Sequence, residues 1–545
     1  MNKTRFFNKI FQRNFIKWCL IIVSLSFLCY FLYSLNFSVS LVGLKQFYQH
    51  LKNLFSFVNI DPQFKGESLW IKNLELMWIT IKLVFSGSFV GLILAFFSAY
   101  FTALNLWKHN WWTWILRVII LVLRSLPIIL IITIFKATYR GEMIAFMIFW
   151  YSTWLWLQRY FCDIFESSDT NKFYRDINNG MFHFKSFYIN IFLNHKNKFL
   201  MNSLLAIESN IRWNSILGSV GVFGIGFLFN LYKNQFQYLG ISVLYIVFFV
   251  FIFELILVFY NKYLFIAPKI KHSNKNTPKS WKYNYKKIIN WVIFSIYFSI
   301  VIISFLELSQ IKTDFYSFIS HLKVLFYFDF SEIIAKPDIY LIYWEIFKQT
   351  YIAIYLGFVF AFWFAILMSE KLIQSQISII FKSFIILLKS IPVIVFYVLF
   401  NSFLNPATSL VLSVIILTFR SMSKQFSETI NKIDQSKIDY WKSLGYTKFF
   451  IYKNFLFPMY RKAILSLVLF ESEGTYRNFI TYGIFSSYSL YTFVDRYSNR
   501  DNSEEKILPL FVPAFIFYFL LELIFLIYKT QIWQKIYLKI IKFKS

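Results

Sequence analysis

Apolar segments long enough to cross a lipid bilayer recur along the whole 545-residue sequence. A helical crossing takes about 20 apolar residues, and only helices or closed barrels satisfy their own backbone hydrogen bonds in hydrocarbon. The candidate spans are residues 18–35, 77–101, 118–135, 141–157, 199–217, 239–260, 291–306, 351–367, 384–400, 407–419, 463–479 and 511–528. This pattern predicts an all-α, polytopic membrane protein with about 12 transmembrane helices.

A shift of 265 positions brings rare residue types of the later sequence onto the same types in the earlier sequence. Under this shift Gly445, Glu473, Arg477 and Gly483 fall on Gly180, Glu208, Arg212 and Gly218. A shift of 270 places Glu345, Thr350, Gly357 and Ala365 on Glu75, Thr80, Gly87 and Ala95. Chance similarity in a Phe- and Ile-rich chain would match the common residues instead. We therefore predict two tandem homologous six-helix halves, 1–260 and 291–545, joined by a basic cytoplasmic linker, 261–290.

The sequence has 56 Lys and Arg against 27 Asp and Glu, a net charge of +29. In a soluble protein this excess would suggest nucleic-acid binding, but here the bases flank apolar segments, as the positive-inside rule describes. They concentrate in the N-terminus, 158–198, 261–290, 420–462 and the C-terminal tail. We predict a multi-pass plasma-membrane protein with both termini in the cytoplasm and no nucleic-acid partner. The first apolar run is too long for a cleavable signal peptide.

Two predicted spans each carry a Glu four residues before an Arg, Glu208/Arg212 and Glu473/Arg477. A charge at mid-bilayer costs roughly 2.5–3.5 kcal/mol on insertion scales, so these groups should face the bundle interior. Two interpretations remain open. The pairs either neutralise themselves and fix helix packing, or they contact the solute, since Arg suits phosphate or phosphonate by bidentate contact.

A second set of bases precedes two prolines. Arg117 and Arg124 lie before Pro127, while Lys382 and Lys389 lie before Pro392 at the same spacing. We expect a kink at each proline and snorkelling of the first base in each pair. We favour a structural role for the second bases, Arg124 and Lys389, with attraction of an anion in the translocation pathway as the alternative.

A glycine-rich segment follows the Glu208/Arg212 span. Gly218, Gly221, Gly224 and Gly226 lie within nine residues, but Phe227 and Leu228 stand where a phosphate-binding loop requires Lys and Ser/Thr. We predict a broken or closely packed helix here and a similar hinge or packing role for Gly483. Three cysteines and six histidines show no metal, disulfide or catalytic spacing. We expect no metal, no bound cofactor and no enzymatic activity of this chain.

A polar loop precedes each of the two spans that carry a Glu/Arg pair. The later loop begins with Asp439 and reaches Gly445, then Phe455 and Pro458. It resembles the cytoplasmic loop of ABC importer permeases, of form Glu-Ala-Ala-x3-Gly-x9-Ile-x-Leu-Pro. The Glu-x3-Arg helix and Gly-rich segment are similar to the phosphonate-uptake type. The earlier loop keeps Gly180, but Tyr174 and Leu193 replace the acid and the proline.

The resemblance implies an ABC importer permease fold, with both permease units fused in one chain, as in a mollicute high-affinity uptake system. It implies docking of a cytoplasmic ABC ATPase dimer, which binds ATP and Mg, through Asp439, Gly445, Phe455 and Pro458, and through Gly180. An extracytoplasmic lipoprotein would supply a small anionic, phosphonate- or phosphate-bearing solute, which is imported by alternating access. The alternatives are a duplicated secondary transporter driven by an ion gradient and a membrane-embedded enzyme.

Overall fold

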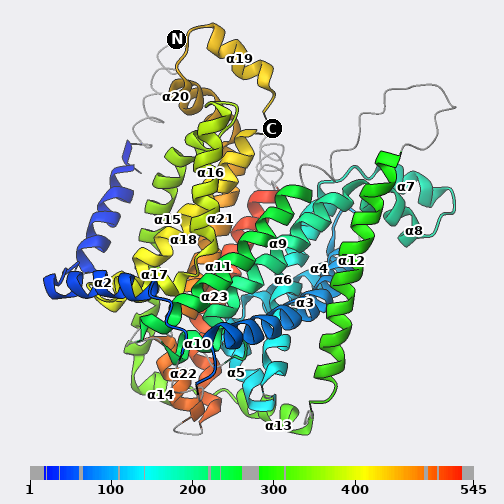
Figure 1. Cartoon of the computed structure of the whole chain (residues 1–545). Coiled ribbons are helices and arrows are strands. Elements are labelled where there is room, and N and C mark those ends of the chain that lie inside the picture. Colours follow the sequence, from blue (N-terminus) through cyan, green and yellow to red (C-terminus); the bar gives the residue numbers. More distant parts are fainter. Residues whose placement is uncertain are drawn as a thin grey trace, which may run out of the picture. The chain divides into compact units, whose positions relative to one another are not determined.

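The computed structural model describes residues 18–19, 21–35, 37–60, 66–107, 111–139, 141–218, 222–232, 235–260, 281–311, 315–431, 433–483, 489–499 and 503–530. Over these residues the secondary structure is helical, without a β-strand (Figure 1). The all-α prediction is therefore confirmed for the described chain. Most of the basic linker, the N-terminal basic residues, the C-terminal tail and Gly221 lie outside the described residues.

The earlier part of the chain contains a helix at Ile21–Ser34, α2 (Leu41–Leu54), α3 (Leu69–Thr102), α4 (Trp111–Ser125), α5 (Ile128–Thr138), α6 (Glu142–Glu166), α7 (Asn171–Asn178), α8 (His183–Phe187), the π-helix η2 (Tyr188–Phe192), α9 (Leu193–Leu217), α10 (Gly226–Leu231) and α11 (Phe236–Phe259).

The later part contains α12 (Trp281–Leu308), α13 (Phe315–Leu325), α14 (Ser331–Ala335), the 3-10 helix η5 (Pro337–Tyr340), α15 (Leu341–Leu367), α16 (Ser375–Ser390), α17 (Val393–Phe400), α18 (Pro406–Asn431), α19 (Gln435–Ser443), α20 (Lys448–Ile451), the π-helix η6 (Tyr452–Leu456), α21 (Phe457–Tyr482), α22 (Leu490–Asn499), the 3-10 helix η8 (Glu504–Lys506) and α23 (Ile507–Thr530).

Each predicted span coincides with a helix, but fewer helices are long and apolar enough to cross a membrane by themselves. In the described chain these are α3, α11, residues 288–308 of α12, α15 and α18. Two bent helix pairs, α4/α5 and α16/α17, raise this number to as many as seven. The structure thus supports a polytopic membrane protein, and the figure of about 12 spans stays a prediction.

Two of the predicted spans are bent at their prolines. Residues 118–135 and 384–400 are not single rods: α4 meets α5 at 81° and α16 meets α17 at 79°. Pro127 and Pro392 lie at these breaks, because proline lacks the amide donor and its ring clashes with the preceding helical turn. The kinks expected from sequence are confirmed and are sharp. Helix α12 begins at Trp281, within the range predicted for the linker.

The chain packs as two compact units that do not follow the order of the sequence. Compact unit 1 contains Met1–Leu51, Ile334–Lys389 and Val393–Phe493. Compact unit 2 contains Lys52–Ile333, Ser390–Pro392 and Val494–Ser545. Each compact unit therefore combines residues from both predicted halves.

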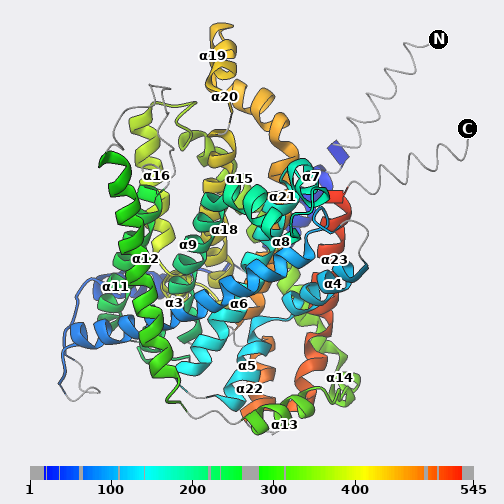
Figure 2. The same ribbon diagram turned by 90° about the vertical axis from the view of Figure 1, so that its right-hand side faces the viewer.

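In compact unit 2 the core forms where α3 lies along α6, side by side in both views (Figures 1 and 2). Gly87 and Gly91 permit this approach: a Cβ at Gly91 would lie 2.7 Å from the Cβ of Thr153. Helix α12 also packs on α3, where the Tyr297 hydroxyl donates to Phe85 O at 3.1 Å and the Ser304 hydroxyl bonds Ser86 at 2.9 Å.

In compact unit 1 the corresponding core forms between α15 and α18. A Cβ at Gly357 would lie 2.2 Å from Thr418 Oγ1, so only glycine fits this crossing. The helix Ile21–Ser34 covers α15, with the Phe31 ring 5.8 Å from Trp344 and 5.4 Å from Tyr351, both edge to face. These contacts tie the N-terminal helix to residues more than 300 positions later in the chain.

Candidate functional site

The loop between α18 and α21 is an ordered helical hairpin. Helix α19 ends in a turn at Gly445, whose φ of 80° lies in the left-handed region that glycine adopts without strain. The Gly445 amide donates to Lys442 O at 3.0 Å and the Tyr446 amide to Trp441 O at 3.4 Å. The turn reverses the chain into α20, which continues through η6 into α21 without a break. Both views show α19 and α20 projecting beyond the first turns of α21 (Figures 1 and 2).

Apolar packing holds this later loop on compact unit 1. Ile438, Ile451 and Tyr452 are buried against a core that includes Phe426 and Ile430 of α18. Within the loop the Trp441 and Phe455 rings stack at 4.8 Å, nearly parallel at 10°. Because Phe455 sits in η6, this stack couples α19 to the start of α21.

The outer face of the later loop is apolar and exposed. Tyr440 is 62% exposed and Leu444 54% exposed, and Tyr446 and Phe450 are exposed beside them. Asp439 lies on α19 at this surface, accepts a hydrogen bond from Gln435 at 2.9 Å and lies 3.7 Å from Lys442 Nζ. We call Tyr440, Leu444, Tyr446 and Phe450 the later-loop surface.

The earlier loop, between α6 and α9, has the same backbone path. Gly180 has φ 86°, its amide donates to Ile177 O at 2.9 Å, and the Met181 amide donates to Asp176 O at 3.0 Å. A π-helix, η2, again leads into the long helix, α9. The side chains differ. Under the 265-residue shift, Asn190 and Asp176 take the places of Phe455 and Trp441. Where the later loop has a ring stack, the earlier loop has a hydrogen bond from Asn190 to Asp176 at 2.8 Å.

The earlier loop also differs in its anchor. Tyr174, at the position of Asp439 under the 265-residue shift, donates its hydroxyl to Asn105 O at 2.6 Å and fastens the loop to the α3–α4 connection. His183 stacks on Trp107 at 4.1 Å and bonds Tyr100 at 2.5 Å and Leu106 O at 3.3 Å. Burial lowers the pKa of His183 below its ordinary value of 6.5. Leu193, at the position of Pro458, begins α9 and is partly exposed.

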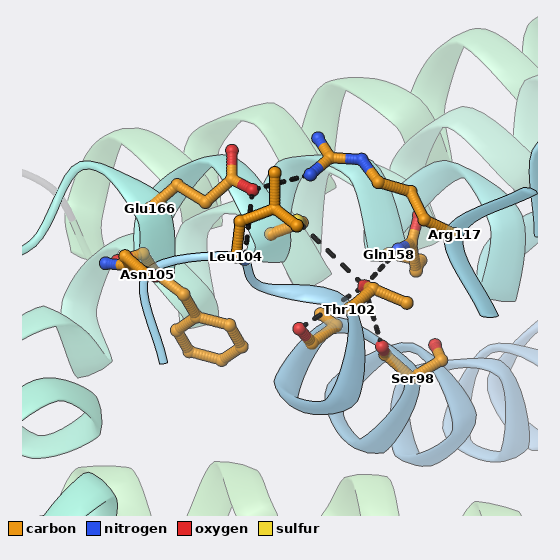
Figure 3. Close-up of polar contacts among 10 residues, drawn as sticks. Ser98, Thr102, Leu104, Asn105, Arg117, Gln158 and Glu166 are labelled. Atoms are coloured by element: carbon orange, nitrogen blue, oxygen red, sulfur yellow. Dashed lines mark hydrogen bonds and ion pairs between the residues drawn. The ribbon is translucent and has the colours of Figure 1, made fainter. Parts of the chain in front are cut away.

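Polar contacts fix the α3–α4 connection to the end of α6 (Figure 3). Arg117 donates to Glu166 at 2.8 Å, and the Leu104 amide donates to the same carboxylate oxygen at 3.4 Å. Nearby, Gln158 donates to Thr102 at 2.9 Å and Asn105 donates to Phe165 O at 2.7 Å. Arg117 is therefore ion-paired within the protein, where sequence predicted snorkelling. Lys382, its counterpart, pairs with Glu370.

Both Glu/Arg pairs form. Arg212 Nε lies 2.7 Å from Glu208 Oε1, and Arg212 Nη2 donates to Glu208 Oε2 at 3.2 Å. Arg477 Nη2 donates to Glu473 Oε1 at 2.7 Å. Glu208 is 1% exposed, whereas both arginines keep an accessible part, 16% of the Arg212 side chain and 28% of the Arg477 side chain. Each pair thus buries its acid, while part of each arginine side chain stays accessible.

The bases Arg124 and Lys389 lie next to the last residues of α4 and α16, at the two sharp bends, and both are half-buried. Gly218, Gly224 and Gly226 of the glycine-rich segment lie close to neighbouring atoms. A Cβ at Gly218 would lie 1.9 Å from the backbone of Gly226. Gly224, at φ 134°, lies against Asn214 and Thr80. Gly483 similarly ends α21, where the Ser489 hydroxyl donates to Gly483 O at 2.6 Å.

Sequence reasoning missed a second acid on α21, beside Glu473. Glu471 accepts hydrogen bonds from the Ser421 hydroxyl at 2.6 Å and from the Gln425 amide at 2.7 Å, both on α18. One signal was present: under the 265-residue shift Glu471 falls on Ala206, so this acid has no counterpart in the earlier half. The described residues contain no group of three or more His, Cys, Asp or Glu that could hold a metal ion.

Comparison with known proteins adds two relatives. The chain is 24% identical over 507 residues to the ABC transport system permease protein p69 of Mycoplasma genitalium, covering 89% of each chain. It is 22% identical over 472 residues to the protein of the same name from Mycoplasma pneumoniae, covering 84% of this chain and 86% of that one. No family model matches the sequence. No solved structure matches it either.

Proposed function

We propose that this chain is the transmembrane permease of an ABC importer and forms the whole membrane pathway in one polypeptide. The observation that carries the proposal is similarity to proteins named as ABC transport system permeases along nearly the full length of both chains. Chains that align from end to end at this level share architecture more securely than substrate, so the solute rests on separate arguments.

Two fused permease units are supported by repeated elements at equivalent places. The bent pairs α4/α5 and α16/α17 correspond, as do α6 and α18, η2 and η6, and α9 and α21. The two loop glycines share a left-handed φ, 86° at Gly180 and 80° at Gly445. Recurrence of rare backbone features at one spacing favours duplication over chance.

In this proposal the two loops receive the motion of separate cytoplasmic ABC ATPase subunits, which bind ATP and Mg. The later-loop surface offers apolar side chains to a groove on such a subunit. Because α20, η6 and α21 are continuous, displacement of the loop moves α21, which carries Glu473 and Arg477. At 1.5 Å per residue, Arg477 lies about 30 Å along the helix from Pro458, a distance comparable with a bilayer core.

The transported solute in this proposal is a small phosphonate- or phosphate-bearing anion delivered by an extracytoplasmic lipoprotein. The support is that the Arg212 and Arg477 side chains are both partly accessible, and that each is held by a buried Glu. A planar guanidinium binds tetrahedral oxyanions in bidentate fashion. Arg124 and Lys389, half-buried at the bends, add positive charge to the pathway.

Uptake into membrane vesicles tests the transport class. Vesicles from cells expressing the chain together with its ATPase and lipoprotein are supplied internally with ATP, and entry of radiolabelled methylphosphonate and phosphate is measured. We expect uptake of a labelled anion that requires hydrolysable ATP and persists with a protonophore and a sodium ionophore. Uptake abolished by the ionophores and indifferent to ATP would instead establish a secondary transporter.

A variant in the later loop tests coupling. Gly445→Asp places a charge next to the apolar later-loop surface, so we expect loss of ATP-driven uptake with normal membrane insertion. Glu428→Gln, an exposed change on α18, serves as the control. Normal uptake by the Gly445→Asp protein would contradict a coupling role for this loop.

A further inference from the structure

Glu471 is held by neutral donors alone. The Ser421 hydroxyl and the Gln425 amide both donate to its Oε1, and the Gln425 amide also lies 3.2 Å from Ser421 Oγ. Within the described residues no Lys, Arg or His pairs with this carboxylate, although Lys424 lies on the same half-buried face of α18. An acid in a predicted span without a counter-charge is costly and marks a functional position.

One buried acceptor of this cluster lacks a donor. The Gln425 amide group is used on Glu471, which leaves Gln425 Oε1 buried without a hydrogen-bond partner. A buried carbonyl oxygen without a partner costs about 1–3 kcal/mol. A carboxylate and an orphaned amide oxygen together need what the surrounding protein does not supply, a positively charged group with several N–H donors.

The face that carries Glu471 is open. Gly474 lies one turn further along α21, and a Cβ built there would meet no atom within 4 Å. Asn478 continues the same face at i+7, and Glu471, Gly474 and Asn478 are all half-buried rather than enclosed. The space beside Gly474 is therefore unfilled by the side chains of the described residues.

The earlier half closes the equivalent place. At the positions of Ser421, Gln425 and Glu471 it has Trp156, Tyr160 and Ala206, and the Trp156 and Tyr160 rings contact each other at 4.4 Å. The acid is therefore no structural requirement of this helix pair, since the same crossing of α6 and α9 is made with aromatic and small side chains.

We propose that Glu471, Ser421 and Gln425 form a subsite that binds a cationic N–H donor group, such as an ammonium, amidinium or guanidinium, on a transported solute that carries this group in addition to its phosphonate or phosphate. The assignment of the occupant as a transported solute rests on the proposed importer function. The subsite lies in compact unit 1 alone, so the two halves of the pathway make different contacts with the solute.

Carbodiimide labelling of the purified full chain in lipid nanodiscs tests this subsite without ATP or ATPase. Dicyclohexylcarbodiimide modifies carboxyl groups in apolar surroundings, and peptide mass spectrometry locates the adduct at Glu471. We expect low-millimolar guanidinium to slow this modification several-fold relative to equal concentrations of tetramethylammonium, which has no N–H, and of sodium. Gln425→Leu should keep the labelling but lose most of the protection by guanidinium. Glu428→Gln, on an exposed position of α18, should change neither.

Three results would overturn the subsite. Equal protection by all three cations would indicate screening, strongest protection by sodium would indicate a metal-ion site, and absence of an adduct at Glu471 would show a closed face. The outcome is independent of the importer proposal. Failure of ATP-driven uptake with retained guanidinium protection would remove only the transport role. Normal uptake without protection would remove only the subsite.

Discussion

Left-handed glycines set the shape of both loops at the scale of single residues. At Gly445 and Gly180 a Cβ would meet no atom within 4 Å, so space does not explain the glycine. The backbone does, because φ near 80° costs other L-residues about 1–2 kcal/mol. Both glycines were identified from the sequence, since their spacing from the following span repeats.

Two substitutions at Gly445 should therefore separate backbone strain from side-chain bulk. Gly445→Val should destabilise the later loop by about 1–2 kcal/mol and reduce uptake, whereas Gly445→Asn should be nearly neutral because Asn tolerates the left-handed region. Hydrogen exchange of residues 435–458 measures the loop, with Gly180→Val as the matched change in the earlier loop. Equal exchange in the Val and Asn variants would refute the strain argument.

The Glu473–Arg477 pair carries a second prediction at this scale. Arg477→Gln removes the ion pair from the buried Glu473 carboxylate, and the cost should be about 1–3 kcal/mol, below the ~3–5 kcal/mol of a fully buried pair because 28% of the Arg477 side chain is exposed. Joint replacement by Glu473→Gln and Arg477→Gln should restore thermal stability but not uptake. Recovery of both would mean that the pair only fixes packing.

The anchors of the two loops differ at the scale of helices, and one anchor titrates. His183 Nε2–H donates to Leu106 O, and in the neutral ring, which burial favours, Nδ1 accepts from the Tyr100 hydroxyl. The pKa of His183 is lower in the folded loop than in the unfolded chain. As the pH falls below 6.5, the unfolded chain therefore binds a proton at His183 before the folded loop does. Stability from this anchor is thus present above pH 6.5 and falls as the pH drops below it.

Hydrogen exchange of residues 171–192 should accelerate below pH 6.5, after correction for intrinsic exchange, while residues 435–456 should not respond in this way. The later loop is an internal control because Lys448 replaces His183 under the 265-residue shift. His183→Phe keeps an aromatic ring against Trp107 but cannot titrate, so it should remove the difference. A pH response that survives this change would assign it to another group.

The sequence was sufficient for features that depend on local chemistry. Apolar length placed a helix at each predicted span, and Pro127 and Pro392 predicted the bends between α4 and α5 and between α16 and α17. It was insufficient where distant segments decide the outcome. The role of Glu471 depends on Ser421, 50 residues earlier on another helix, and no spacing in the chain reveals that contact.

At the scale of the whole chain, the first helix of each predicted half packs on a helix of the other predicted half. We call this arrangement the exchange of the first helices. The helix Ile21–Ser34 begins the earlier half but packs on α15, through Phe31, Trp344 and Tyr351. Helix α12 begins the later half but packs on α3, where Lys82 and Glu307 form an ion pair. Hydrophobic periodicity gives the faces of a helix but not its partner, so the sequence alone did not predict this exchange.

The exchange makes a prediction about a divided chain. Compact unit 1 needs residues of Met1–Leu51 together with Ile334–Lys389, so neither residues 1–270 nor residues 271–545 can complete either compact unit alone. Each fragment expressed by itself should be degraded or aggregate, because α15 and α3 would expose apolar faces that the missing helices cover. Coexpression should restore a complex that copurifies and transports.

A version of 271–545 coexpressed with 52–270 separates the effect of the first helix: loss of Phe31 and its neighbours should lower the thermal stability of the complex and expose α15 to proteolysis. A stable, protease-resistant 271–545 fragment on its own would show that the exchanged helix contributes nothing to the fold of compact unit 1.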